Sequence, residues 1–227
     1  MGNDLNKLDG GDDYYQSTPL VNDLNKSDDY QSIALVVNDD EPDSNKEYKI
    51  ITYKNGGQYE GECENNKRHG KGKMVHKNGD RYKGEWMDGK RHGQGKATYE
   101  NGIYEGEWNN NVRDGQGTAI YKNGSLYKGN WKYDKPHGHG KIRYANGDCY
   151  KGDWKNGQEH GHGKITYANG DCYEGEWKNG QREGYGKVAY ANGDCCEGEW
   201  KNDHSKSIFA DGSAYHEWCN NEKLLVR

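Results

Sequence analysis

Histidine side chains, common ligands for transition metals, recur at a fixed spacing along this 227-residue chain. They are His69, His92, His137 and His160, with His139 and His162 two residues after the last two. Imidazoles on neighbouring loops could together bind a metal ion. However, Asp114 and Glu183 replace the histidine in other copies without changing the spacing. We therefore expect histidines that cap loops and no metal site.

Three cysteines, Cys149, Cys172 and Cys195, also share one register. In stacked hairpins, equivalent positions lie two strands apart, about 9.5 Å, whereas a disulfide spans at most about 7 Å between Cα atoms. Cys195 and Cys196 are adjacent, so they point to opposite faces of a strand, and no Cys-x-x-Cys pair accompanies them. We expect free thiols and no zinc site.

The chain shows no constellation of residues suited to catalysis. A catalytic site needs a nucleophile, an oriented base and a pocket, but the polar residues here recur in every copy and form no unique cluster. We therefore expect no enzymatic activity and no cofactor. Basic residues of the loops, Lys67, Arg68, Lys90 and Arg91, could contact anionic lipid or the acidic face of a partner. Interspersed glutamates weaken that field, which favours a solvated surface of mixed charge.

Charge divides the chain into two regions. Residues 1–46 hold 11 acidic and 3 basic residues, a net charge of -8, and since the whole chain carries -5, residues 47–227 carry +3. Asp-rich clusters, Pro19 and Pro42, without sustained periodicity, predict a disordered acidic arm. Neither a membrane-spanning apolar run nor a signal peptide is present. The expected location is the cytoplasm, alone or at the periphery of a membrane or the cytoskeleton.

The elements that position these residues follow from an internal repeat. The motif Tyr-x-Gly-x-Trp recurs every 23 residues, except for one step of 22 between Tyr82 and Tyr104. Such self-similarity predicts a stacked array, here spanning residues 47–219. We expect full repeats at 59–81, 82–103, 104–126, 127–149, 150–172 and 173–195, then a diverged cap at 196–219 and a tail at 220–227.

Each repeat is predicted to be a β-hairpin. Tyr82, Gly84 and Trp86 fall on one face of a strand, because side chains alternate between faces along a strand. The glycines should make room for an aromatic ring from an adjacent strand. The Asn-Gly that ends each copy, as in Asn78-Gly79, is typical of a two-residue type I′ turn. Glycine costs about 1 kcal/mol in a helix interior, so an antiparallel sheet is expected.

The stretch from Tyr173 to Asp194 reads Tyr-Glu-Gly-Glu-Trp-Lys-Asn-Gly, then Gly-x-Gly-Lys and Tyr-Ala-Asn-Gly-Asp, and it closely resembles the MORN repeat. The resemblance covers roughly residues 48–203. It implies an all-β fold, an elongated single-layer antiparallel sheet of tandem hairpins forming an open solenoid-like rod, with aromatic rings on one side. Family members attach to other domains, as in phosphatidylinositol phosphate kinases and junctophilins, so the resemblance also implies a scaffold.

We therefore expect a non-enzymatic scaffold or adaptor that binds a partner protein, or a second copy of itself as a homodimer, through the aromatic face. The candidate contact residues are Tyr82, Trp86, Tyr104, Trp108, Tyr127, Trp131, Tyr150, Trp154, Tyr173 and Trp177. The alternative is peripheral binding to anionic phospholipid membranes through Lys67, Arg68, Lys90 and Arg91. No nucleic-acid partner is expected.

Overall fold

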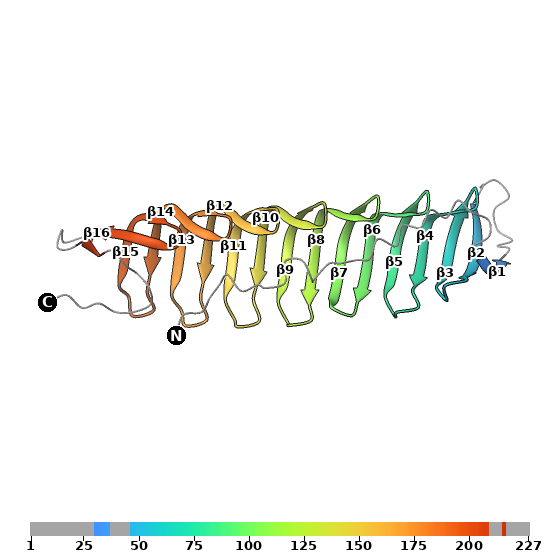
Figure 1. The fold of residues 1–227 in the computed structure, drawn as a ribbon, viewed down its shortest axis with the longest axis horizontal. Coiled ribbons are helices and arrows are strands. Elements are labelled where there is room, and N and C mark those ends of the chain that lie inside the picture. The colour runs from blue at the N-terminus through green and yellow to red at the C-terminus, as the bar shows by residue number, and fades with distance from the viewer. Residues whose placement is uncertain (1–29, 37–45, 209–214, 217–227) are drawn as a thin grey trace. The chain divides into compact units, whose positions relative to one another are not determined.

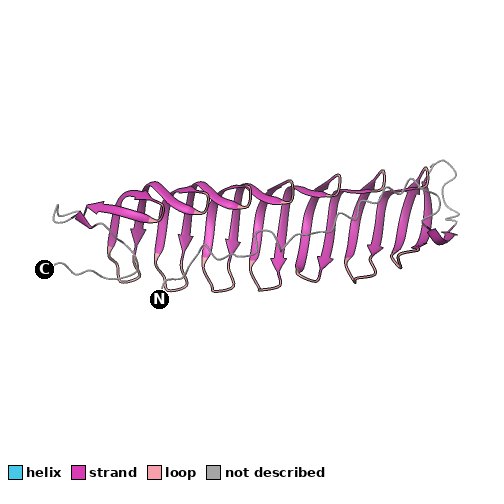
Figure 2. Cartoon of the chain, viewed as in Figure 1, coloured by secondary structure: helices cyan, strands magenta, loops and turns pink. Residues whose placement is uncertain are grey.

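The structure is a computed structural model that describes residues 30–36, 46–208 and 215–216. The chain divides into two compact units. In the described part, the first unit comprises residues 30–36, 46–123 and 131–134, and the second comprises 124–130, 135–208 and 215–216. None of the described residues forms a helix, so no helix there could span a membrane (Figure 2).

Both units are open antiparallel sheets in which each strand pairs with the strand before it in the chain (Figure 1). The first unit holds β1 (Tyr30–Val36), β2 (Lys46–Tyr53), β3 (Gln58–Glu64), β4 (Lys67–Val75), β5 (Arg81–Met87), β6 (Lys90–Tyr99), β7 (Gly102–Asn109) and β8 (Val112–Tyr121). Strand β9 (Leu126–Lys132) contributes to both units. The second unit holds β10 (Lys135–Arg143), β11 (Cys149–Lys155), β12 (Gln158–Thr166), β13 (Cys172–Lys178), β14 (Gln181–Ala189), β15 (Cys195–Lys201), β16 (His204–Ile208) and β17 (Tyr215–His216). The predicted sheet of tandem hairpins is confirmed.

The segment predicted to be a disordered arm lies mostly outside the described residues. Within it, the structure describes β1, which pairs with β2 over the register Ile33↔Ile51 to Val36↔Tyr48. These seven residues therefore differ from the expected disorder. Their sequence includes the apolar run Ile-Ala-Leu-Val, which suits a strand.

The two ends of each hairpin carry different turns. At one end, two successive residues have positive φ, as in the type I′ turn, and we call these seven turns the tip turns. They are Asn65-Asn66, Asp88-Gly89, Asn110-Asn111, Tyr133-Asp134, Asn156-Gly157, Asn179-Gly180 and Asn202-Asp203. The type I′ conformation therefore occurs at this end of the hairpin, which is not the end for which it was predicted.

The opposite end carries a three-residue loop, which we call the base loop. In the loop after β4, the amide of Gly79 donates to the carbonyl of His76 at 2.9 Å, and only Gly79 has positive φ, at 92°. Asn78 Oδ1 accepts from the amide of Asp80 at 3.1 Å, an Asx turn. The predicted two-residue type I′ turn at this Asn-Gly was wrong. In the 22-residue repeat, residues 82–103, the base loop is shorter, because Tyr99 pairs directly with Gly102.

Glycines in the middle of each hairpin leave room for a tyrosine ring, as predicted. Gly152 and Gly163 face each other on β11 and β12, and a methyl group on Gly163 would lie 2.5 Å from Cζ of Tyr150. Beyond this pair the register shifts at a β-bulge, and Gly161 takes a φ of 64°. The hydroxyl of Tyr150 donates to the carbonyl of Asp153 at 3.0 Å, which satisfies a carbonyl at the bulge. The packing of this ring against the backbone therefore requires glycine on the two strands and tyrosine at Tyr150.

Candidate functional site

The ten aromatic side chains predicted to form a partner-binding face lie in the interior of the two units. Their exposed fractions run from 0% for Tyr127, Tyr150 and Tyr173 to 6% for Trp154. The other six, also buried, are Tyr82, Trp86, Tyr104, Trp108, Trp131 and Trp177. This corrects the expectation that the rings stand ready to contact a partner, because neighbouring side chains already cover them.

The rings pack edge to face along each unit. In the first unit, the ring of Tyr82 lies 5.0 Å from that of Trp86 and 5.4 Å from that of Trp108, with interplanar angles of 84° and 88°. Trp108 also donates its indole N–H to the carbonyl of Gly95 at 3.2 Å. Each tryptophan therefore ties its own repeat to the previous one, and edge-to-face pairs of this kind contribute about 0.5–1.5 kcal/mol beyond burial.

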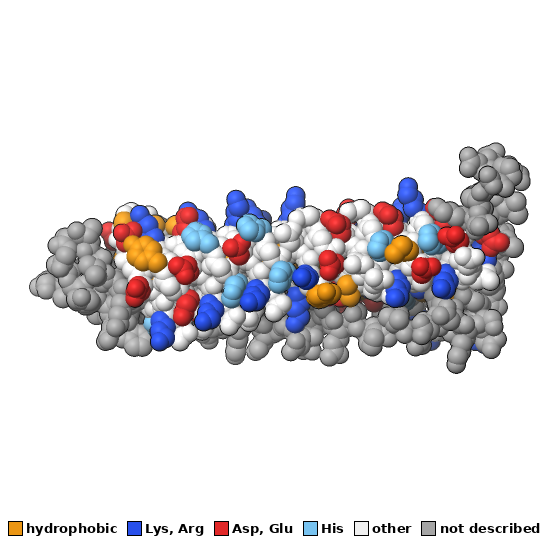
Figure 3. Space-filling model, turned by 90° about the horizontal axis from the view of Figure 1, so that it is seen from above, with side chains coloured by type: hydrophobic (Ala, Val, Ile, Leu, Met, Phe, Trp, Pro, Cys, Tyr) orange, Lys and Arg blue, Asp and Glu red, His pale blue; other side chains and the backbone are white. Residues whose placement is uncertain are grey.

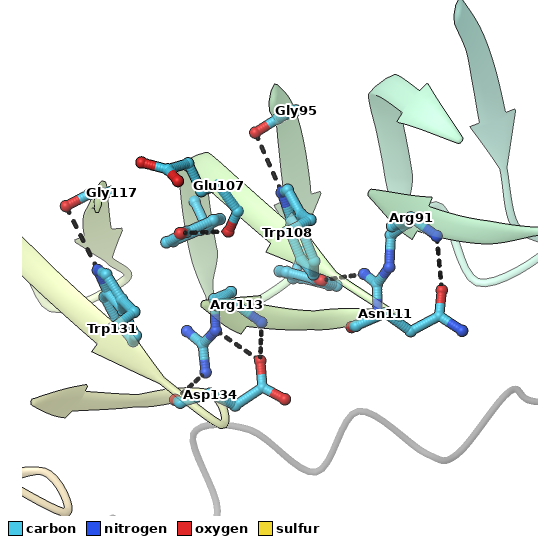
Figure 4. A network of polar contacts seen from close by, with 11 residues as sticks. Arg91, Gly95, Glu107, Trp108, Asn111, Arg113, Gly117, Trp131 and Asp134 are labelled. Carbon is cyan, nitrogen blue, oxygen red and sulfur yellow. Dashed lines mark hydrogen bonds and ion pairs between the residues drawn. The ribbon is translucent and has the colours of Figure 1, made fainter. Parts of the chain in front are cut away.

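Four arginines cover the rings from the hairpin tips, and we call them the clasp arginines: Arg68, Arg91, Arg113 and Arg182. Arg113 is 2% exposed, and its guanidinium carbon lies 4.3 Å from the centroid of the Trp131 ring. Its Nε donates to Asp134 Oδ1 at 2.9 Å, and a terminal nitrogen donates to the Asp134 carbonyl (Figure 4). The arginine of one repeat thus holds the tip turn of the next by stacking and charge-assisted hydrogen bonds.

The other clasps repeat this geometry. Arg91 stacks on Trp108 at 4.1 Å and donates to the carbonyl of Asn111 at 2.8 Å. In the second unit, Arg182 Nε lies 3.1 Å from Asp203 Oδ1. Arg68 and Arg91, assigned from sequence to lipid binding, are therefore already packed on tryptophan, whereas Lys67 is half-buried and Lys90 is exposed.

We expect Arg113→Lys to lower the free energy of unfolding by about 1.5–3 kcal/mol, the range for hydrogen bonds to charged groups. A lysine cannot reproduce the planar fork that stacks on Trp131 and binds Asp134 at once. Urea unfolding followed by tryptophan fluorescence measures the change. Arg81→Lys, at an exposed position of the same unit, is the matched control. Equal losses in the two variants would contradict the clasp.

Side chains also bridge successive base loops in the second unit. Ser125 Oγ accepts from the amide of Ala145 at 3.1 Å, and Asp148 Oδ1 accepts from the amide of Ala168 at 2.8 Å. Asp148 is only 3% exposed, and its carboxylate also accepts from the side-chain amide of Asn146 at 2.8 Å, so protein groups and not solvent hold it. Repeats of this unit are therefore joined at both ends of their hairpins.

Lysines line up across the outward face of each sheet, opposite the rings. We call two sets the lysine ladders: Lys73, Lys83 and Lys96 in the first unit, and Lys141, Lys151 and Lys164 in the second. In both ladders the middle lysine lies directly opposite the other two on the neighbouring strands. All six are exposed. Adjacent strands lie about 4.8 Å apart, so each ladder gathers three positive charges within about 10 Å.

Each ladder ends on a glutamate. Lys96 Nζ lies 3.2 Å from Glu105 Oε2, and Lys164 Nζ lies 3.1 Å from Glu174 Oε2. The hydrogen bond to Glu174 raises the pKa of Lys164. The central lysines, Lys83 and Lys151, face only lysines across the sheet. The lysines of both ladders recur at fixed positions of the repeat, a pattern that the predictions from sequence did not include.

The remaining surface is of mixed character. On the face drawn in Figure 3, basic, acidic and histidine side chains are interspersed, and hydrophobic side chains occupy only small patches. His139 Nδ1 lies 3.1 Å from Asp153 Oδ1. Among the described residues, no group of three or more histidine, cysteine, aspartate or glutamate side chains is arranged to hold a metal.

Five cysteines of the described region are free thiols. Cys195 is exposed, whereas Cys63 and Cys196 are buried. Burial raises the pKa of the Cys63 thiol to about 11, so that thiol stays protonated at neutral pH. A buried, protonated thiol is a poor nucleophile, and Cys63 therefore fills space in the core.

Comparison with known proteins gives one clear family match. The model of the family described as MORN repeat matches residues 59–81, 82–103, 104–126, 127–149, 150–172 and 173–195. These bounds coincide with the repeats expected from the sequence. No curated protein matches the chain.

Two solved structures show a weak likeness. The TCP domain of SAS-4 (dCPAP) of Drosophila melanogaster, in complex with a proline-rich motif of Ana2 (dSTIL), is 16% identical over 74% of this chain and 90% of that chain, with a TM-score of 0.43. The wild-type TCP10 domain of Danio rerio CPAP is 15% identical over 72% of this chain and 81% of that chain, with a TM-score of 0.40. At TM-scores this low, neither likeness bears on function.

Proposed function

The chain belongs to the MORN repeat family, and from this premise we propose that it is a non-enzymatic scaffold that binds an acidic segment of a partner protein along its lysine ladders. The family is a family of repeat scaffolds, and no catalytic family is indicated. Because the rings are used by the core, the partner must be met by outward side chains. The ladders place three exposed lysines side by side on that face.

The observation that carries the proposal is the like-charged register of the ladders. Lysines placed directly opposite each other destabilise a sheet by a few tenths to about 1 kcal/mol per pair. The fold accepts glutamate at such positions, since Glu105 and Glu174 occupy them in neighbouring strands. Lys83 and Lys151 therefore lower the stability of the sheet and provide no structural gain. Carboxylates of a bound partner would remove that repulsion.

The size of a ladder suits an extended acidic segment. Alternate side chains of an extended chain lie about 6.6 Å apart on one face, so three or four residues span the roughly 10 Å of a ladder. Two copies of this chain would bring lysine against lysine if their ladders met. The proposed partner is therefore a different, acidic protein and not a second ladder.

The test is a titration with fluorescein-labelled octaglutamate at low salt, read by fluorescence anisotropy. Replacing Lys141, Lys151 and Lys164 by glutamine should weaken binding at least about tenfold, or about 1.4 kcal/mol. The matched control replaces Lys155, Lys178 and Lys201, which are exposed lysines of the same unit outside the ladder. It removes the same charge and should weaken binding less than about twofold. Equal weakening would show attraction to net charge alone and would overturn the proposal.

Anionic lipid is the alternative ligand, and vesicles rich in phosphatidylserine provide its test. Arg68 and Arg91, two of the four residues assigned to this role, are packed on Trp86 and Trp108. We expect the ladder variant and the wild type to sediment equally little with such vesicles. Strong vesicle binding by a wild type that ignores octaglutamate would favour the lipid function instead.

A further inference from the structure

Two exposed histidines lie on the outward face beside the lysine ladder of the second unit. His139 and Lys141 are two residues apart on β10, and His162 and Lys164 are two residues apart on β12. Side chains two residues apart on a strand share a face and lie about 7 Å apart. Both histidines are exposed, and the side chain of His139 is 88% exposed. They therefore border the surface that we propose for the acidic partner.

A carboxylate stands opposite each of these histidines. Asp153 on β11 lies in register with His139, and its Oδ1 is 3.1 Å from His139 Nδ1. Glu176 on β13 lies in register with His162. Asp153 also accepts a hydrogen bond from the backbone amide of His162 at 3.3 Å. While the imidazoles are neutral, these two carboxylates repel an acidic segment on the ladder.

The other side chains around the two histidines act in both directions. The ladder lysines on the same strands, Lys141 and Lys164, repel a protonated imidazole, whereas the carboxylates attract it. From β9, Asn130 reaches the same stretch of β10 and carries no charge. His160 also lies in register with Asp153, beyond the β-bulge, and it is half-buried. Each exposed histidine thus stands between a carboxylate across the sheet and a lysine along its own strand.

The lysine ladder of the first unit has different neighbours. Lys71 and Gln94 occupy the positions that the two exposed histidines occupy in the second unit. An acidic residue again lies opposite each of them. His92, at the position of His160, is half-buried like it. Neither lysine nor glutamine changes charge between about pH 5 and 8. The two ladders therefore differ in the groups that titrate beside them on the exposed face.

From this difference we infer that the ladder of the second unit is a pH-dependent binding site, which binds its acidic partner more tightly when His139 and His162 are protonated. The inference rests on the proposed function of the ladders. Histidine ordinarily changes charge between about pH 5 and 8. As the pH falls through that range, the two imidazoles become cations that offset Asp153 and Glu176 and border the three lysines. As the pH rises again, the added affinity is lost.

Coulomb's law gives the size of the expected effect. A unit charge about 7 Å from a carboxylate of the bound segment changes the affinity about 2.5-fold in water at low salt. The two imidazoles together should therefore change it about fivefold. Because both are exposed, added salt should reduce this response to pH.

The experiment measures octaglutamate binding by fluorescence anisotropy at about pH 7.5 and about pH 5.5, on either side of the usual histidine titration. A rhodamine label replaces fluorescein, whose own emission changes in this range. The peptide stays ionised at both pH values, since glutamate titrates near about pH 4.3. A chain whose first-unit ladder is replaced by glutamine should bind about fivefold more tightly at the lower pH. A chain whose second-unit ladder is replaced instead should change less than about twofold.

Paired substitutions in the chain that keeps the second-unit ladder locate the effect. His139→Gln with His162→Gln should leave binding at the higher pH unchanged and remove the tightening at the lower pH. Glutamine occupies this position at Gln94, so the hairpin accepts it. The matched control, His69→Gln with His92→Gln, removes two imidazoles from the first unit and should keep the tightening.

The outcomes separate this inference from the proposed function. If the chain that keeps the second-unit ladder binds equally tightly at both pH values, the inference is wrong and the ladder proposal stands. The same holds if the variant without His139 and His162 tightens as much as its parent. Failure of octaglutamate to bind at either pH would overturn both.

Discussion

Replacing Trp108 by alanine should lower the free energy of unfolding by about 3–5 kcal/mol, the largest effect of any single substitution considered for this chain. Trp108 is 3% exposed and packs against Tyr82 and Tyr104 at 5.4 and 5.1 Å. It also carries the guanidinium of Arg91 and bonds to Gly95. One substitution therefore removes contacts to two repeats. Urea unfolding and hydrogen exchange would measure the loss and its location.

The loss should be concentrated at one junction, because repeat arrays are stabilised mainly by interfaces between neighbours. Amides of β5 to β8 should lose protection first. Tyr133→Ala is the matched control, since Tyr133 belongs to the same unit but is 70% exposed; it should leave the unfolding midpoint unchanged. If Trp108→Ala had as little effect as Tyr133→Ala, the rings would not be the core.

Gly163→Ala should have the second largest effect, about 3 kcal/mol, at the upper end of the range typical of overpacking. A β-carbon there would lie 2.5 Å from Cζ of Tyr150 and closer still to its hydroxyl oxygen. The ring cannot retreat without breaking its hydrogen bond to Asp153 and its contact with Trp177. Thermal unfolding should show a drop of about 6–12 °C for a domain of this size.

Gly193→Ala separates steric clash from backbone strain. A methyl group on Gly193 would meet nothing within 4 Å, but its φ of 94° disfavours alanine. We expect a loss of about 1 kcal/mol, from backbone strain alone. If Gly163→Ala lowered the free energy of unfolding no more than Gly193→Ala, the tyrosine ring would not be the reason that position 163 requires glycine.

The hairpins and their glycines could be predicted because each depends only on spacing within one repeat. Alternation from Tyr82 to Trp86 fixes a two-faced strand, and Gly95 must be bare to admit a ring. Turn type could not be predicted from the dipeptide alone. Asn-Gly occurs in the base loop at Asn78 and in the tip turn at Asn156, and the hairpin register decides which conformation it takes.

The arginine cover over the rings was beyond sequence reasoning because it arises from contacts between repeats. A flat single layer would leave one face of rings in water. Here the tips cover that face, as Arg113 lies over both Trp131 and Tyr104. The signal for such a clasp was present, since Arg113 and Arg182 each precede an aspartate by 21 residues. It is recognisable only once neighbouring tips are known to touch.

The most direct test of the account is the single substitution Lys151→Glu, measured for both stability and binding. A glutamate between Lys141 and Lys164 replaces two repulsive pairs by attractive ones. The free energy of unfolding should therefore rise by about 0.5 kcal/mol, while the affinity for octaglutamate should fall at least about tenfold. A variant that is less stable than wild type, or that binds octaglutamate equally well, would contradict the proposal that these lysines are kept for an acidic partner.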